Sequence, residues 1–391
     1  MCEAYPAIAA AREVALTEFD RPIYMLMGLP VDAVTTAQAT ELVRNAALNG
    51  NKCFLSTPNL NFAITAGRDS AFRDSVIDSD LVLADGMPLI WTAKLLGIPV
   101  PERVAGSSVA ANLQHDRPAN RQIRVYFFGG QPGVAEQACR KLADQQGGLI
   151  GVGYHNPGFG SVEEMSSESI LADINAAKPD LVLVSLGAKK GQAWIQANRH
   201  KIYAPVISHL GAVVNFIAGT VARAPNWMQR TGLEWVWRML EEHALIKRYW
   251  QDGLAFLMEL RLHILPLRRA IKVWHGRLPS LPPLRVVLDE QGETGLRLKV
   301  TGRACGTELS QARQIFKVVA AKTPARIEVE LKDCVYVDGA FLGLLCLLLK
   351  HQRAAGQELV LTGVTDQLKQ LFGLYGAAYL LLPALSREKS A

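Results

Sequence analysis

Five short apolar runs, each ending in a glycine, proline or aspartate, constrain the fold of this chain more than any other feature. They read KCFLSTP, DLVLAD, IRVYFFGG, DLVLVSLG and APVISHLG, and they begin at residues 52, 80, 123, 180 and 204. Continuous apolar runs without strict alternation are typical of strands that are buried on both faces. Because these runs alternate with helical patterns from about Tyr24 to Gly219, they predict βα units around a mostly parallel sheet.

Small and polar residues gather where the predicted strands end. Asp85, Gly129, Gly130, Gly187 and Gly211 all fall at these positions. In open parallel sheets, ligands bind beyond the carboxyl ends of the strands. The sequence therefore predicts a binding site at this edge.

The pattern changes twice further along the chain. Residues 223–277 form a basic, aromatic tract with helical spacing, and LPSLPPL at 278–284 places three prolines in a short linker. Beyond the linker, strand and helix patterns alternate over about a hundred residues, the usual size of a small domain. We predict an α/β domain at 1–222, a helical appendage at 223–277, the linker, and a small α/β domain at 285–391.

Composition narrows the class of protein. The 391 residues are 49% hydrophobic and 20% charged, which is typical of a well-cored globular protein. The net charge of +6 favours an acidic partner such as a phosphate-bearing substrate, an anionic lipid or nucleic acid. The six cysteines form no CxxC pair, so neither a zinc site nor a redox motif is supported. We find no signal peptide and no run long enough to span a bilayer, and we expect a cytoplasmic protein.

The residues alone leave the roles of Asp85 and of the glycine loop open. An aspartate just before a helix commonly caps it, and spacing favours that role, but a general base at the mouth of the sheet would also occupy this position. Gly129, Gly130 and Gly133 could offer backbone N–H groups to a diphosphate or simply form a tight turn. His155 lies in a loop rich in glycine and proline, where a structural role is more usual.

A longer series of motifs is similar to the motifs of a known protein family. TPNLNF (57–62), LVLADGMPLIWTAKLLGIPVPERVAGSSV (81–109), FFGGQPGVAEQA (127–138) and RAPNWMQRTGLEWVWRML (223–240) follow one another in this order. The series resembles the WecG/TagA/CpsF glycosyltransferase family over about two-thirds of the chain. The resemblance implies a Rossmann-like domain that transfers an N-acetylmannosamine-type sugar from a UDP-sugar donor to a polyprenyl-diphosphate-linked sugar, with inversion and with neither metal nor cofactor.

The resemblance also implies roles for individual residues. Asp85 would be the catalytic base, and Thr57 and Asn59 would line the donor pocket, although TPN also suits a turn. Arg103 would contact phosphate or sugar, although it could instead be a surface arginine paired with Glu102. From the glycine loop itself, we assign Gly129 and Gly130 to substrate binding, with the tight turn as the alternative.

Two stretches depart from the family pattern. Residues 187–192 read GAKKGQ where the family usually has Gly-x-Pro-Lys-Gln-Glu, so Gly191 replaces a glutamine. HLGAVVNF, which contains Asn215, differs from the usual Gly-Val-Gly…Asp-Phe. Because both stretches are expected near the donor pocket, the identity of the transferred sugar stays open.

The basic tract divides into two parts. Its proximal part resembles the appendage with which the family covers its active site, and this assigns Arg223, Arg230 and Arg238 to the lipid diphosphate. The distal part, in which arginines alternate with tryptophans and leucines, favours an interfacial helix on an anionic membrane over a nucleic-acid arm. A helix packed on the core is the alternative.

The strand LKVTGRA (298–304) is followed by RIEVELKDCVYVDGAFLGLLCLLLKHQRAAGQELVLTGVTDQLKQLFGLYG (326–376). By these stretches, residues 285–391 resemble a STAS domain. The phosphorylation loop of such domains usually reads Asp-Ser-Ser-Gly, whereas this chain has Asp338, Gly339, Ala340 and Phe341. No hydroxyl occupies the phosphoacceptor position, so regulation through phosphorylation of this loop is not expected. The apolar helix that follows could contact a protein partner.

The sequence thus predicts a glycosyltransferase that lies on the inner face of the cytoplasmic membrane and contributes to envelope or exopolysaccharide synthesis. Its expected partners are the UDP-sugar, the lipid-linked acceptor and the anionic membrane surface, without nucleic acid. A STAS partner and a homo-oligomer are left open. The alternative is a non-catalytic regulator that senses a nucleotide sugar and signals through the STAS domain. Asp85 favours the enzyme, and Gly191 favours the regulator.

Overall fold

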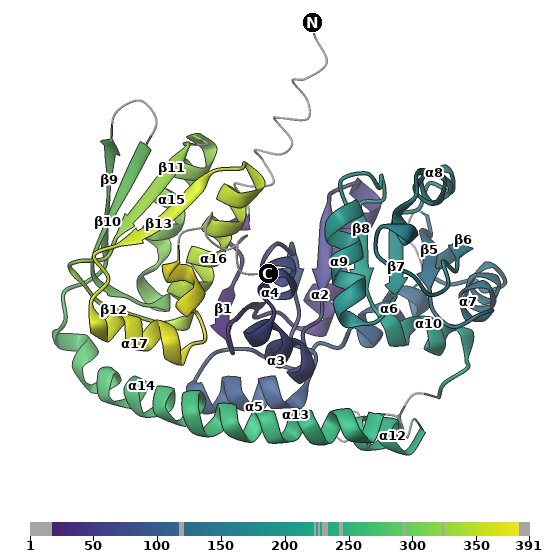
Figure 1. The fold of residues 1–391 in the computed structure, drawn as a ribbon, viewed down its shortest axis with the longest axis horizontal. Coiled ribbons are helices and arrows are strands. Elements are labelled where there is room, and N and C mark those ends of the chain that lie inside the picture. Colours follow the sequence, from purple (N-terminus) through teal and green to yellow (C-terminus); the bar gives the residue numbers. More distant parts are fainter. Residues whose placement is uncertain are drawn as a thin grey trace, which may run out of the picture. The chain divides into compact units, whose positions relative to one another are not determined.

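The protein forms two compact units that do not follow the order of the chain (Figure 1). The first combines Met1–Ala33, Trp91–Pro99 and Leu257–Ala391, and the second combines Val34–Ile90 with Val100–Phe256. The computed structural model describes residues 18–116, 121–222, 224–225, 227–228, 234–241, 245–291, 295–322 and 324–382.

A parallel sheet forms the centre of the second unit. Within its described residues, six strands lie in the order β4-β3-β8-β7-β5-β6, and every neighbouring pair is parallel. This arrangement confirms the predicted fold class. The strands are β3 (Cys53–Ser56), β4 (Leu81–Val82), β5 (Ile123–Gly129), β6 (Leu149–His155), β7 (Leu181–Ser185) and β8 (Val206–His209).

Strand β6 was not among the five predicted strands. Its sequence, LIGVGYH, is interrupted by Gly151 and Gly153, which weaken the apolar signal. Both glycines have a packing reason. A Cβ atom on Gly153 would come within 2.6 Å of the Tyr126 ring, and one on Gly151 would come within 2.3 Å of the Cys139 carbonyl oxygen. The close packing that requires glycine here also hides the strand from a reading of the sequence.

Helices cover both faces of this sheet. One buried cluster joins the sheet to α2, α6, α7 and α10. On the other face, Trp194 of α9 stacks on Phe128 of β5 with ring centroids 4.2 Å apart. The helices of the second unit are α2 (Thr36–Asn49), α3 (Leu60–Arg68), α4 (Ser70–Ile77), α6 (Gly106–His115), α7 (Val134–Ala143), α8 (Glu168–Ala176), α9 (Ala188–Asn198) and α10 (Gly211–Ala218). Helix α5 (Met87–Leu96) begins in the second unit and ends in the first.

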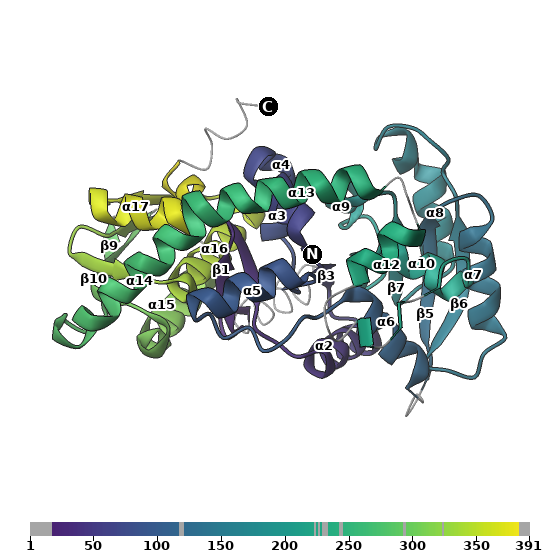
Figure 2. The same cartoon turned by 90° about the horizontal axis from the view of Figure 1, so that it is seen from below.

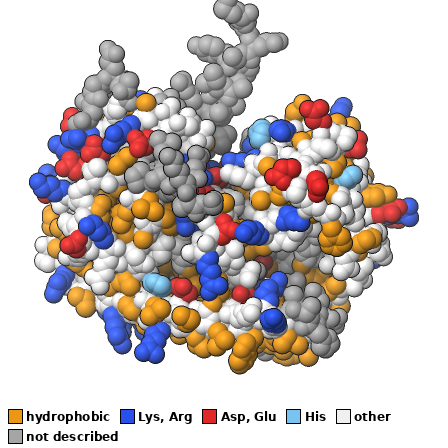
Figure 3. Space-filling view, in the orientation of Figure 1, with side chains coloured by type: hydrophobic (Ala, Val, Ile, Leu, Met, Phe, Trp, Pro, Cys, Tyr) orange, Lys and Arg blue, Asp and Glu red, His pale blue; other side chains and the backbone are white. Residues whose placement is uncertain are grey.

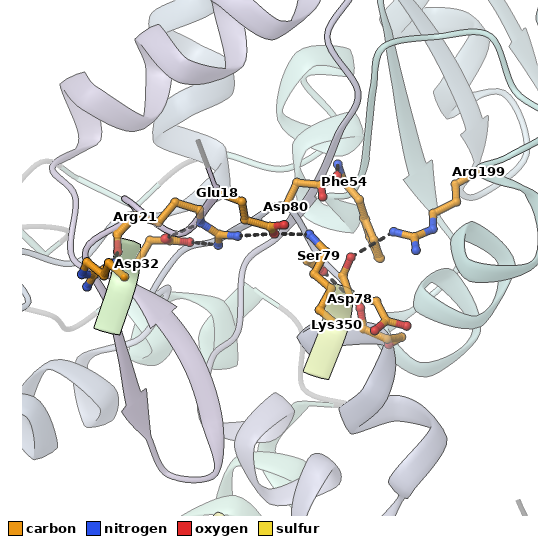
Figure 4. A network of polar contacts seen from close by, with 11 residues as sticks. Glu18, Arg21, Asp32, Phe54, Asp78, Ser79, Asp80, Arg199 and Lys350 are labelled. Atoms are coloured by element: carbon orange, nitrogen blue, oxygen red, sulfur yellow. Dashed lines mark hydrogen bonds and ion pairs between the residues drawn. The ribbon is translucent and has the colours of Figure 1, made fainter. Parts of the chain in front are cut away.

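Polar contacts hold the short strand β4 beside β3 (Figure 4). The Asp80 backbone N–H donates to the Phe54 carbonyl at 2.8 Å, and the Phe54 N–H donates to the Asp80 carboxylate at 2.7 Å. Arg199 donates to the Asp78 carbonyl at 2.9 Å and lies over the Phe54 ring. These contacts fix where β4 runs, and therefore where the residues after it emerge at the edge of the sheet.

The first unit contains the small α/β domain predicted at the C-terminal end of the chain. In its sheet β10 pairs in parallel with β11 and β12, β11 pairs in parallel with β13, and β9 pairs antiparallel with β10. The elements are β9 (Arg285–Gln291), β10 (Gly295–Ala304), α15 (Ser310–Lys322), β11 (Arg326–Glu330), β12 (Cys334–Val337), α16 (Gly339–Ala354), β13 (Glu358–Thr362) and α17 (Asp366–Leu374).

An N-terminal hairpin, β1 (Ile23–Leu26) with β2 (Leu29–Asp32), packs on α16 in this same unit. Glycines permit the close approach, since a Cβ atom on Gly343 would lie 2.9 Å from the Ile23 carbonyl oxygen. The Lys350 ammonium pairs with Glu18 at 2.5 Å, and Arg21 pairs with Asp32 at 2.5 Å (Figure 4). Residues that the sequence-based division assigns to the N-terminal domain thus cover a helix of the C-terminal one.

The basic tract is helical, as its spacing predicts (Figure 2). Among the described residues, no helix is both long and apolar enough to cross a membrane. The tract contains α12 (Glu234–Glu241), α13 (Leu245–Glu259), a π-helical turn (Leu260–Ile264) and α14 (Leu265–Arg277), and the linker begins with a 3-10 turn (Leu278–Ser280).

Candidate functional site

The carboxyl ends of β3 and β4 bring the TPN and DG motifs together. The Asp85 backbone N–H donates to the Pro58 carbonyl at 2.8 Å. A Cβ atom on Gly86 would come within 3.4 Å of Asn59 Cα, so the two loops are in contact. Asn59 and Asp85, which are distant in sequence, therefore lie at one edge of the sheet, where open α/β sheets bind ligands.

Arg103 approaches Asp85 from the loop before α6. The Val104 N–H donates to the Ala84 carbonyl at 2.9 Å, which ties this loop to the end of β4. The Arg103 Nη1 atom lies 3.7 Å from Asp85 Oδ1 and donates to Glu234 Oε2 at 2.9 Å. The alternative pairing of Arg103 with Glu102 is not formed, because the Glu102 carboxylate accepts from the Thr36 backbone N–H at 2.6 Å. Arg103 thus sits between two carboxylates.

Glu234 is a site residue that the sequence reading did not single out. It lies in the first turn of α12, within the GLEW part of a motif that carried the family resemblance. Among the arginines assigned to the lipid diphosphate, Arg223 and Arg230 lie outside the described residues. Arg238 belongs to α12, and its side chain is also outside them. Their assignment stays a prediction.

Asn59 and Thr57 both contribute to the local fold. The Asn59 Oδ1 atom accepts from the Phe62 backbone N–H at 3.1 Å and caps α3, so its turn-forming role is present. Among the described residues its amide group has no partner and stays available to a ligand. Thr57 is largely buried, with its methyl group against Gly106 at the start of α6.

The start of helix α5 bears on the role of Asp85 as a helix cap. Helix α5 begins at Met87, so Gly86, rather than Asp85, directly precedes it.

Gly129 and Gly130 form a turn after β5 that favours glycine. Their φ angles are 88° and 92°, a region that L-residues with side chains rarely adopt. A Cβ atom on Gly129 would lie 2.7 Å from the Ser185 carbonyl oxygen, and the Gly130 N–H donates to that oxygen at 2.8 Å. The tight-turn role is therefore present, and diphosphate binding by this loop stays a prediction.

The two stretches that depart from the family pattern, at Gly191 and in HLGAVVNF, are in contact through His209. His209 ends β8, and a Cβ atom on Gly191 would lie 2.2 Å from its Cδ2 atom. The imidazole therefore fills the volume that a side chain at position 191 would occupy. Burial lowers the pKa of His209 to about 4, so the ring is neutral at pH 7. Asn215, the other departure, lies within α10.

An apolar stripe is exposed along α13, where hydrophobic and basic side chains gather at the lower edge of Figure 3. Trp250 is 71% exposed and Met258 63%, far more than large apolar side chains usually are. On the opposite side of the helix, Asp252 is buried and accepts from the Asn61 amide at 3.1 Å. The stripe consists of Ile246, Trp250, Leu254, Leu257 and Met258, with Lys247 and Arg248 exposed beside it.

Asp338 of the C-terminal domain caps α16. Its carboxylate accepts from the backbone N–H groups of Ala340 and Phe341 at 3.0 Å each and from that of Gly306 at 2.7 Å. Burial raises the pKa of Asp338. A Cβ atom on Gly339 would lie 3.1 Å from the Met25 carbonyl oxygen, so the N-terminal hairpin packs against this loop.

Comparison with known proteins agrees with this arrangement. Residues 24–270 match the model of the glycosyl transferase WecG/TagA/CpsF family, and residues 287–383 match that of the Mlab, STAS domain. An N-acetylglucosaminyldiphosphoundecaprenol N-acetyl-beta-D-mannosaminyltransferase of Bacillus spizizenii is 28% identical over 56% of this chain and 82% of its own length. A protein of the same name from Staphylococcus aureus is 24% identical over 57% of this chain and 86% of its own. The predicted resemblance is confirmed for both parts of the chain.

Proposed function

The chain belongs to the WecG/TagA/CpsF glycosyltransferase family, and from this premise we propose that it transfers an N-acetylmannosamine-type sugar from a UDP-sugar to a polyprenyl-diphosphate-linked sugar. The single observation that carries the proposal is the meeting of Asn59, Asp85 and Arg103 at the carboxyl ends of β3 and β4. The names of the relatives support the acceptor, because those proteins are described as acting on N-acetylglucosaminyldiphosphoundecaprenol.

Asp85 would act as the base in a single displacement. Its side chain is 27% exposed at the edge of the sheet, where it can meet a substrate. The acceptor hydroxyl oxygen attacks the anomeric carbon, its proton passes to the Asp85 carboxylate, and the bond to the UDP oxygen breaks with its electron pair leaving on UDP. Attack from the face opposite to the leaving group inverts the anomeric centre. In this proposal no metal takes part.

The departing diphosphate needs positive charge or hydrogen-bond donors. Arg103 supplies a guanidinium 3.7 Å from the proposed base, and the Gly129–Gly130 turn lies along the same edge of the sheet. Arg223, Arg230 and Arg238 are proposed for the diphosphate of the lipid acceptor. Thr57 and Asn59 would hold the donor sugar, Asn59 through the amide group that its capping role leaves unused.

The acceptor is anchored in a membrane, and α13 offers a surface for reaching it. Its exposed apolar stripe, flanked by Lys247 and Arg248, has the composition of a helix that lies in an anionic interface. We therefore propose peripheral association with the inner face of the cytoplasmic membrane. The C-terminal STAS domain would regulate the enzyme by binding a partner, because the loop after Asp338 carries no hydroxyl to phosphorylate.

The deciding experiment measures UDP release by purified full-length protein with a panel of UDP-sugars, with and without a polyprenyl-diphosphate-N-acetylglucosamine acceptor. Acceptor-dependent release from one UDP-N-acetylhexosamine is expected. Binding of the UDP-sugars without release, under conditions where a curated relative is active, would contradict the proposal and favour a regulator that senses nucleotide sugars.

A further inference from the structure

His209 occupies an unusual position in the second unit. It ends the central strand β8, and the residue is half-buried at the edge of the sheet that carries the candidate site. Among the described residues its Nε2 atom is buried without a hydrogen-bond partner. Buried polar atoms are normally paired, so the unpaired Nε2 bears on which ring nitrogen carries the proton.

Two glycines and an aromatic ring shape the space around this imidazole. A Cβ atom on Gly191 would collide with Cδ2 at 2.2 Å, and one on Gly211 would lie 3.6 Å from Nε2. The Phe62 ring is 6.5 Å away between centroids, and the backbone N–H of Phe62 is the group that Asn59 caps. His209 is therefore packed in one orientation, beside the proposed donor pocket.

The order of the strands places His209 between two proposed parts of the donor site. Its strand β8 lies between β3, which leads to Thr57 and Asn59, and β7, which contacts the Gly129–Gly130 turn through Ser185. If the donor sugar lies at Thr57 and Asn59 and the diphosphate lies at the Gly129–Gly130 turn, His209 lies near the bond between sugar and diphosphate. This step rests on the proposed function.

We infer that His209 determines donor specificity by hydrogen-bonding the sugar of the UDP-N-acetylhexosamine, and that Gly191 is present to make room for its ring. Nε2 has no acceptor nearby, and a lone pair is less costly to leave unpaired than an N–H group, so the proton belongs on Nδ1. Nδ1 lies on the ring edge opposite to Cδ2 and faces away from Gly191. It can donate to a hydroxyl or acetamido oxygen of the sugar. A neutral imidazole suits such a group better than it suits a diphosphate.

The test compares UDP with UDP-N-acetylmannosamine by isothermal titration calorimetry on the full-length protein. His209→Phe keeps a flat ring but removes the hydrogen bond. It is expected to raise the Kd of the sugar nucleotide about five- to tenfold, the usual effect of one lost hydrogen bond, and to change the Kd of UDP less than about twofold. His200→Phe, at an exposed position, is the matched control and should change neither Kd.

A second pair of variants tests the link between the two positions. Gly191→Gln alone should weaken sugar-nucleotide binding strongly, because its side chain meets the imidazole. Gly191→Gln combined with His209→Gly should recover binding and shift the preference among UDP-sugars. If His209→Phe does not fold, His209→Gln replaces it, and the thermal unfolding of each variant is measured alongside binding.

The outcomes separate this inference from the proposed function. Equal losses of UDP and of UDP-N-acetylmannosamine affinity in His209→Phe would overturn the role in sugar recognition, and so would unchanged affinities for both. A wild-type protein that binds UDP-N-acetylmannosamine and transfers its sugar, while the His209 variants behave like it, leaves the proposed function standing and refutes the inference alone. A wild-type protein that binds no UDP-sugar refutes both.

Discussion

Asp85 and Glu234 approach the same atom of Arg103, its Nη1, which lies 3.7 Å from the aspartate and 2.9 Å from the glutamate. Asp85 follows a strand of the sheet, whereas Glu234 belongs to α12 of the basic tract. The contact ties that tract to the edge of the sheet where a ligand would bind. An anionic substrate that pairs with Arg103 as proposed would compete with both carboxylates, and its binding would then be coupled to the position of α12.

Replacing the proposed base is the first test of the mechanism. Asp85→Asn keeps the size and most of the polarity of the side chain but cannot accept the acceptor proton. We expect turnover to fall about a hundredfold or more while UDP still binds, because general-base catalysis typically contributes on this scale. Steady-state UDP release measures the change, and Asp144→Asn, at an exposed site at the end of α7, is the control. Near-normal turnover would leave Asp85 with a structural role only.

Arg103 should not tolerate lysine. A guanidinium can donate in several fixed directions at once, whereas an ammonium acts as a compact point charge. Arg103→Lys is therefore expected to lower kcat/KM about ten- to a hundredfold, in line with the loss of one charge-assisted hydrogen bond. Arg121→Lys is the matched control, because Arg121 also pairs with a carboxylate, that of Asp180 at 2.5 Å, but precedes β5. Equal effects of the two substitutions would argue against a substrate contact at Arg103.

The stripe on α13 should govern membrane binding. Trp250→Glu with Leu254→Glu places two charges on its exposed apolar surface, and we expect at least about a tenfold loss of binding to phosphatidylglycerol vesicles. Sedimentation with vesicles measures the change, and Tyr203→Glu, at another exposed aromatic side chain, is the control. The basic contribution should weaken with salt, because exposed charges are screened beyond about 8 Å at physiological ionic strength. Unchanged sedimentation of the double variant would contradict the membrane assignment.

The buried imidazole of His209 should make the protein sensitive to mild acid. Burial lowers its pKa in the folded state from the ordinary 6.5 to about 4, so the unfolded chain binds more protons between these values. The free energy of unfolding should therefore fall as the pH drops from about 6.5 towards 4, by roughly 2 to 3 kcal/mol. Urea unfolding at several pH values measures this, and His209→Phe should remove it.

Asp69 and Glu308 titrate in a lower pH window than His209, which separates their effect on stability from that of the imidazole. Hydrogen bonds from Lys189 and Arg303 lower the pKa values of Asp69 and Glu308, whose ordinary values are 3.8 and 4.5. The stability they contribute is present above these values and is lost only below them. His200→Phe, at an exposed position, should keep the full dependence between pH 6.5 and 4. An identical pH profile for His209→Phe and the wild type would contradict the assignment.

The N-terminal hairpin should stabilise the C-terminal domain. Ile23 is fully buried and meets α16 at Gly343, so Ile23→Ala removes three methyl or methylene groups from this contact. A loss of about 2 to 4 kcal/mol is expected, as for other buried Ile-to-Ala changes. Hydrogen exchange of the α16 amides should report it, with Val287→Ala, at an exposed side chain of β9, as the control. Unchanged protection of α16 would show that the hairpin is not part of this core.

The domain fragment provides a related test. Expressed from Leu284 onward, the STAS domain is expected to melt cooperatively, as small single domains usually do. Without residues 18–33, however, α16 loses the cover that Ile23 and Met25 provide, and its midpoint should lie below that of the same domain in the full chain. The chain truncated before the linker should keep transferase activity, since every proposed site residue precedes it. A folded but inactive truncation would refute the two-module prediction.

Local sequence determined much of this protein. Continuous apolar runs ending in small residues predicted β3, β4, β5, β7 and β8, because a strand buried on both faces needs apolar side chains along its whole length. Long motifs identified the family and the STAS domain, and helical spacing identified the basic tract. These features could be read directly because each depends on residues that are close together in the chain.

Contacts between residues that are far apart in the sequence were decided by the tertiary structure alone. The sequence did not predict strand β6, because its glycines leave room for residues of neighbouring elements. Nor did the sequence predict that the N-terminal hairpin would cover α16. The pairing of Arg103 with Glu234, and the packing of His209 against Gly191, join residues that no local pattern connects. Gly191 looked like a lost site residue in the sequence, whereas the fold shows a glycine that makes room for an imidazole. A close contact between two segments constrains both side chains together, and only the folded chain brings those segments into contact.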